Sequence, residues 1–114
     1  MLESTTGQVI DPTLLRIKGE GGFEGHTDAE KDHARRDYIK KLASAILTVI
    51  SKHGTARLKA VGQAALGNAF KAIIIAKGDG AKKGLTLLVD PSFGDADFDG
   101  NVRTAYVLKI VNKE

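Results

Sequence analysis

The sequence predicts one α+β domain whose elements follow in the order strand, helix, strand, helix, strand, strand. Two long stretches repeat apolar residues every three or four positions, as on one side of a helix. Four shorter stretches alternate or are rich in β-branched residues, and glycines separate them. With 114 residues, 42% of them apolar and 27% charged, the chain has room for one such domain with a modest core.

The first strand is predicted at Leu14, Leu15 and Ile17, and it ends at the glycines that follow. Residues 1–13 have no periodic pattern and are predicted to form a flexible arm, so the domain itself is expected to span residues 14–114. A glycine-rich acidic loop then leads to His26.

The first helix is predicted to begin at Thr27, because Glu30 three residues later completes a capping box. Gly54 is placed to end it as a left-handed cap. Leu47 falls outside the apolar stripe of this helix, so it is either an isolated exposed residue or a contact between subunits. The stripe consists of Tyr38, Ile39, Leu42, Ala45, Ile46, Val49 and Ile50.

The second strand is predicted at Arg57 to Val61, and Gly62 turns the chain into a second helix that runs to about Lys77, with Gly78 closing it. Beside an apolar stripe, this helix has a ridge of small side chains that permits a neighbouring element to approach closely. The stripe is Leu66, Phe70 and Ile73, and the ridge is Ala65, Ala69, Ala72 and Ala76.

The triplet Ile73 to Ile75 is also compatible with a buried strand, but its alanine-rich surroundings favour a helix. Ile75 is then expected on the side of Asn68 and Lys71, away from the core. This placement makes Ile75, together with Leu47, a candidate dimer contact.

The last two strands are predicted at Leu85 to Val89 and at Arg103 to Val111. A long hairpin-like connection from Pro91 to Asn101 joins them, with its turn near Asp99 and Gly100.

Asp95, Asp97, Asp99 and Gly100 are spaced as in the first half of a calcium-binding helix-loop-helix. The twelfth position of that pattern needs a bidentate carboxylate, and here it is Tyr106. Strand-like sequence flanks the segment where helices should be. We therefore expect an acidic, solvated hairpin whose charges discourage edge-to-edge pairing of strands.

No catalytic, metal or cofactor site is predicted. His26, His33 and His53 have neither metal-ligand spacing nor a nucleophile beside them, and we expect all three at the surface. The absence of cysteine excludes disulfides and thiolate metal sites. No apolar run approaches the ~20 residues that cross a bilayer, and no secretion signal is recognised. We expect a cytoplasmic, non-enzymatic protein without a membrane partner or a small-molecule substrate.

Positive charge is concentrated in the middle of the chain. Residues 31–83 contain 12 basic and 3 acidic side chains, a net charge of +9, whereas the segments on either side are acidic. Such a block favours a polyanionic partner, or it only solvates two helices. The helix that begins after Gly62 offers free backbone N–H groups that suit a phosphate, although a glycine there also relieves a tight turn.

Two segments, KAVGQAALGNAFKAIIIAKG (residues 59–78) and DPSFGDADFDGNVRTAYVLKIV (residues 90–111), resemble the bacterial stage V sporulation protein S family. This family belongs to the Alba-like small nucleic-acid-binding proteins. The resemblance implies a βαβαββ two-layer sandwich, with two helices on one face of a four-stranded mixed sheet, and a homodimer. It also implies a regulatory role and binding of DNA or RNA through the backbone, using lysines near the first strand, the second helix and a basic hairpin.

This chain departs from the family pattern at two of those places. Its hairpin has three aspartates against Arg103, and only Lys18 stands for the lysines after the first strand. No aromatic residue is interleaved with the basic positions, so double-stranded or structured targets are expected rather than stacked single strands. The predicted nucleic-acid surface is Lys18, Arg36, Lys40, Arg57, Lys59, Gly62, Gln63, Ala64 and Lys71.

The leading hypothesis is therefore a dimeric, non-enzymatic nucleic-acid-binding regulator. The alternative is a protein-interaction or assembly module that has kept the Alba-like scaffold without binding nucleic acid, because a fold does not determine function.

Overall fold

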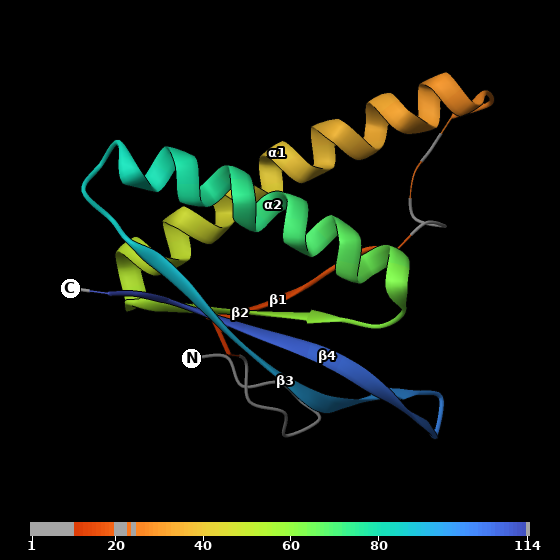
Figure 1. The fold of residues 1–114 in the computed structure, drawn as a ribbon. Helices are drawn as coiled ribbons and strands as arrows, with labels where there is room; N and C mark the ends of the chain where they lie inside the picture. The colour runs from red at the N-terminus through yellow and green to blue at the C-terminus, as the bar shows by residue number, and fades with distance from the viewer. Residues whose placement is uncertain (1–10, 20–22, 24, 114) are drawn as a thin grey trace.

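A computed structural model describes residues 11–19, 23 and 25–113 and confirms the predicted order of elements. The sheet has the strand order β1-β2-β4-β3, with β1 parallel to β2 and the remaining pairs antiparallel. Both helices cover one face of the sheet (Figure 1), so the chain has the expected α+β Alba-like sandwich fold. The elements are β1 (Leu14–Arg16), α1 (Asp28–His53), β2 (Thr55–Ala60), α2 (Gln63–Ala81), β3 (Leu87–Phe98) and β4 (Asn101–Asn112).

Both predicted ends of α1 are confirmed. The backbone N–H of Glu30 donates to Thr27 Oγ1 at 3.1 Å, and the N–H of Thr27 donates to Glu30 Oε1 at 3.3 Å, which completes the capping box. At the other end, Gly54 is left-handed with φ 82°, and its N–H donates to the carbonyl of Ile50.

The start of α2 is as predicted, but its end is not. Gly62 has φ 89°, a conformation that side chains disfavour, and it lets β2 lead directly into α2. Gly78 does not close the helix, which continues to Ala81. The left-handed residue that ends it is Gly84, with φ 83°, and beyond it the N–H of Leu85 donates to the carbonyl of Gly80.

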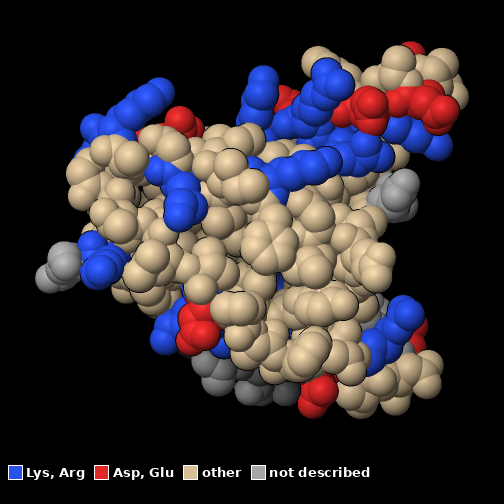
Figure 2. Space-filling model, viewed as in Figure 1, with Lys and Arg blue, Asp and Glu red and all other residues tan. Residues whose placement is uncertain are grey.

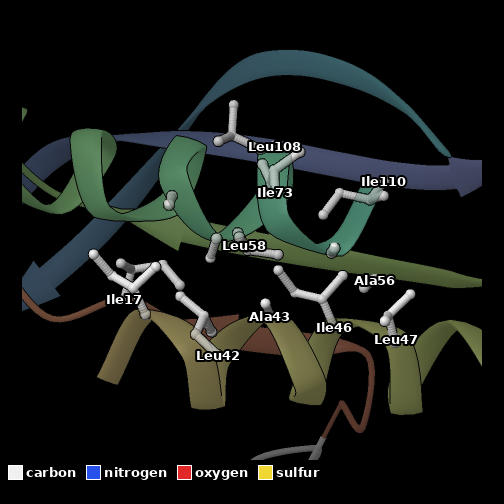
Figure 3. Close-up of a cluster of buried hydrophobic side chains, with 14 of the residues drawn as sticks. Ile17, Leu42, Ala43, Ile46, Leu47, Ala56, Leu58, Ile73, Leu108 and Ile110 are labelled. Carbon is white, nitrogen blue, oxygen red and sulfur yellow. The ribbon is translucent and has the colours of Figure 1, made fainter. Parts of the chain in front are cut away.

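The core lies between the helices and the sheet (Figure 3). In β2, Ala56, Leu58 and Ala60 are completely buried on the helix side, since alternate residues of a strand face opposite ways. The alanine ridge of α2 is also buried, with exposures of 0–1%, which confirms that small side chains form its contact surface. The largest fully buried side chains are Ile46, Leu58, Leu87, Leu108 and Ile110.

The rotation of α2 differs from the prediction. Because the alanine ridge faces inward, Phe70 is turned outward and is 42% exposed, so it does not fill the core. Asn68, expected in solvent, is 5% exposed, and Ile75 is half-buried against the core.

Leu47 was also expected to project outward, and that placement is wrong. Leu47 is 7% exposed and packs against α2 at Gly80, where an added Cβ atom would lie 3.3 Å from its Cδ2 atom. The glycine makes room for the leucine between the helices. Leu47 and Ile75 therefore both belong to the packing within this chain, rather than to an outward face.

The last two strands are longer than predicted, because most residues of the predicted connection between them belong to the strands themselves. Strand pairing runs without interruption to the Phe98–Asn101 pair, so residues 91–98 belong to β3. The turn is confirmed at Asp99 and Gly100, whose positive φ angles of 54° and 86° are typical of a two-residue hairpin turn. Strands rather than helices flank this acidic segment, unlike the helices of a calcium-binding helix-loop-helix.

Part of the predicted arm is attached to the sheet. Residues 1–10 of the arm, and residues 20–22 and 24 of the glycine-rich loop, lie outside the described residues. The Asp11 carboxylate pairs with the Arg57 guanidinium, and the N–H of Arg57 donates to the carbonyl of Thr13 at 2.8 Å. The ordered contacts with β2 thus begin before Leu14.

Two neighbouring leucines of β3 test this placement of the sheet. Leu87 is 2% exposed beneath the helices, whereas Leu88 points to the other face and is 45% exposed. Leu87→Ala should lower the free energy of unfolding by ~2–5 kcal/mol, because it leaves a cavity in the core. Leu88→Ala should lower it by less than about 1 kcal/mol. Urea unfolding measures both, and equal losses would contradict the register of β3.

Candidate nucleic-acid interface

Basic residues lie close together where β1 and β2 end, because these two strands are parallel neighbours and end on the same side of the sheet. Arg16 is the register partner of Lys59, and the N–H of Ile17 donates to the carbonyl of Lys59 at 3.0 Å. Helix α2 begins directly beyond this edge, after Gly62. The end of β1 and the first turn of α2 are consequently neighbours.

Lys18 is held between the two helices by its backbone. Its N–H donates to Tyr38 Oη at 3.0 Å, and its carbonyl accepts from Asn68 Nδ2 at 3.0 Å. The side-chain amide of the buried Asn68 thereby connects α2 to the end of β1. Lys18 Nζ lies 5.4 Å from the centroid of the Tyr38 ring, within the range of a cation–π contact.

Between α1 and the first turns of α2 lies a depression of about 280 Å³, which we call the cationic groove. Arg35 of α1 and Lys71 of α2 give the depression its positive charge. Among the residues that the structure describes, no side chain caps the N-terminus of α2, and the first turn of the helix contains no acidic residue, so the positive end of the helix dipole lies beside the groove. The groove is lined by Arg35, Gln63, Ala64, Gly67, Asn68 and Lys71.

Several of the predicted site residues meet at this place. Gln63, Ala64 and Lys71 line the cationic groove, Gly62 precedes it, and Lys18 is bonded to Asn68 in its wall. Arg36 and Lys40 are exposed on α1, and Figure 2 shows Lys and Arg side chains along the helix layer.

The sequence reasoning missed Arg35 and chose its neighbour Arg36. Arg35 pairs with Asp32, and its guanidinium lies 5.6 Å from the centroid of the Phe23 ring. Its place three residues before Tyr38 puts both on adjacent turns of α1, which is a usable sequence signal.

Two other predicted residues lie on the opposite side of the sheet. Arg57 and Lys59 alternate with the buried residues of β2, so their side chains point to the face without helices. There Arg57 pairs with Asp11 and is the register partner of Lys109. The predicted basic surface is therefore split, with the sheet between its two parts.

Aromatic rings do occur beside the basic residues, contrary to the expectation from sequence order. The Phe23 and Tyr38 rings lie 5.5 Å apart, centroid to centroid, and each faces one cation of the site. Both rings are half-buried. The tertiary fold produces this arrangement, because the two residues are 15 positions apart in the chain.

A second depression, of about 570 Å³, lies between the C-terminal halves of the helices. Lys52, Lys82 and Lys83 line it together with Asp79, so it also has a net positive charge.

The remaining predictions about chemistry concern histidines and metals. His26, His33 and His53 are exposed, as expected. Among the residues that the structure describes, no three histidine, cysteine, aspartate or glutamate side chains are grouped so that they could hold a metal ion. No helix in the described part of the chain is both long and apolar enough to cross a membrane.

Comparison with protein families supports this assignment of elements. The model of the stage V sporulation protein S family matches residues 34–113, more than two thirds of the chain. The match begins just before Arg35 in α1 and includes β2, α2, β3 and β4, whereas β1 and Lys18 lie before it. On the extent of this match, the chain belongs to the stage V sporulation protein S family.

Proposed function

We propose that this chain is a non-enzymatic sporulation regulatory protein that binds DNA or RNA, as a homodimer, through the phosphate backbone. The observation that carries the proposal is the cationic groove, where Arg35 and Lys71 flank the N-terminus of α2, which no described side chain caps. Family membership supports the regulatory part of the proposal.

The groove suits phosphate groups for two physical reasons. Backbone N–H groups at the start of a helix point outward and favour an anion, and the helix dipole adds to this preference. Lysine and arginine side chains on both sides then neutralise phosphates and release counterions. Lys18 adds a third cation whose backbone is fixed by hydrogen bonds to Tyr38 and Asn68.

The aromatic rings favour backbone contacts over stacking on bases. Phe23 and Tyr38 are half-buried, face each other, and each already contacts a cation. A base could stack on either ring only by displacing those contacts. Double-stranded or structured nucleic acid therefore fits the site better than an unpaired strand.

The second candidate function is a protein-interaction module on the same scaffold, and the hairpin favours it. Asp95, Asp97 and Asp99 are all exposed at the end of the β3–β4 hairpin. Three carboxylates there repel a phosphate backbone, so the hairpin is not a second nucleic-acid contact.

Charge reversal on the two faces of the molecule distinguishes these possibilities. The variant Arg35→Glu with Lys71→Glu reverses the groove, and Lys59→Glu with Lys109→Glu makes the same change of charge on the helix-free face. We expect the first to weaken binding to a random-sequence duplex at least about tenfold and the second to leave it nearly unchanged. Fluorescence anisotropy measures both affinities, and circular dichroism checks that the variants are folded. Loss only in the second variant would move the site to the other face, and no binding by the unaltered protein would favour the interaction module.

The dependence of affinity on salt is a separate test. Three cations at the groove should release roughly three counterions, so the logarithm of the binding constant should fall with the logarithm of salt concentration with a slope near −3 per protomer. Lys71→Gln should reduce that slope by about 1, and duplexes of unrelated sequence should give the same slope. A slope close to zero would contradict binding through phosphates.

A further inference from the structure

The helix-free face of the sheet is rich in basic side chains. Both helices pack on the opposite face, and no helix or strand of the described residues covers this one (Figure 1). Because alternate residues of a strand face opposite ways, β1, β2 and β4 each place basic residues on the helix-free face. These residues include Arg16, Arg57, Lys59 and Lys109.

Two cross-strand pairs on this face have like charge. Arg16 of β1 is the register partner of Lys59, and Arg57 is the register partner of Lys109. Neighbouring strands lie only about 4.8 Å apart, so like charges directly opposite each other destabilise a sheet. The second pair is compensated, because the Asp11 carboxylate pairs with Arg57. The first pair is not, since no described carboxylate forms an ion pair with Arg16 or Lys59.

Apolar side chains lie beside these cations. Along β4 the helix-free face has Val107, Lys109 and Val111, an alternation of apolar and basic residues about 14 Å long. Val107 and Val111 are half-buried, and Leu88 of β3, the register partner of Val111, is 45% exposed. An extended ligand that follows β4 therefore meets both positive charge and apolar surface.

We propose that the helix-free face binds an acidic segment of a partner protein that also contains apolar side chains. The carboxylates of the segment relieve the repulsion between Arg16 and Lys59, and its apolar side chains cover Leu88. The proposal goes beyond nucleic-acid binding and does not depend on it, because the cationic groove lies on the other side of the sheet.

A nucleic acid fits this face less well than an acidic protein segment. A phosphate backbone has no apolar side chain to cover Leu88, and it carries one negative charge at every nucleotide. Asp90, the register partner of Lys109, and Asp11, which pairs with Arg57, lie among the cations and repel such a continuous row of charges. A protein segment avoids this repulsion by placing carboxylates only opposite the uncompensated cations.

Binding of a defined peptide to the full chain, measured by fluorescence anisotropy, tests the proposal. The probe is a labelled peptide of repeating Glu-Glu-Leu, and a glutamate-only peptide of the same charge is the comparison. The chain should bind the probe at least about tenfold more tightly, because only the probe covers Leu88. Arg16→Gln with Lys59→Gln should weaken probe binding at least about tenfold. Arg35→Gln with Lys71→Gln, the matched control, removes the same charge at the cationic groove and should leave it unchanged.

Three results would overturn the proposal. The first is no binding of the probe, or equal affinity for the glutamate-only peptide. The second is a loss in the Arg16 and Lys59 variant no greater than the loss in the groove variant. The third is displacement of the probe by a random-sequence duplex in the groove variant, which would assign this face to nucleic acid. Because the probe contains no phosphate, its failure to bind leaves the proposed nucleic-acid function standing.

The stability of the free protein tests the repulsion on which the proposal rests. Lys59→Gln should raise the melting temperature by roughly 2–4 °C, since it removes one of two like charges that face each other. Lys59→Arg is the control, because it keeps the charge at the same position, and it should leave the melting temperature nearly unchanged. Circular dichroism measures both variants. A melting temperature that Lys59→Gln lowers or leaves unchanged contradicts the repulsion and the proposal with it.

Discussion

Close packing of α2 on the sheet determines where every proposed site lies. Four alanines of α2 are buried in the core that also contains Ala56 and Ala60 of β2, so small side chains allow the helix to approach its neighbours closely. This contact sets the rotation of α2 about its axis. The same rotation buries Asn68, which bonds to Lys18, and turns Phe70 outward. A bulky residue in the alanine ridge would change all of these positions together.

Two neighbouring residues of one helix therefore have different surroundings. Lys71 lines the cationic groove, whereas Phe70 is exposed outside it. The homodimer proposed above would present two cationic grooves to one long polyanion, which would strengthen binding through effective concentration.

Local signals in the sequence predicted the boundaries, whereas packing decided the orientation. The capping box at Thr27 and the left-handed Gly54 act within a few residues, so the sequence suffices to place them. The rotation of α2 was misjudged because ranking by hydrophobicity assigns Phe70 to the core, while close packing selects the smaller Ala69. The opposite orientation of Arg57 was predictable, since Arg57 alternates with the apolar Ala56 and Leu58. The spacing of Arg35 and Tyr38 on α1 was a signal in the sequence, whereas the contact of Arg35 with Phe23 could be found only from the fold.

The acidic hairpin is explained by the position of β3 at the edge of the sheet. A 12-residue edge strand exposes backbone groups that could pair with another chain, and Pro91 and the aspartates of β3 discourage such pairing. Position 94 of this strand has room only for glycine, because a Cβ atom there would lie 2.8 Å from Val107 Cγ2. The carboxylates that oppose aggregation of strand edges are thus the same groups that would repel a phosphate backbone from the hairpin.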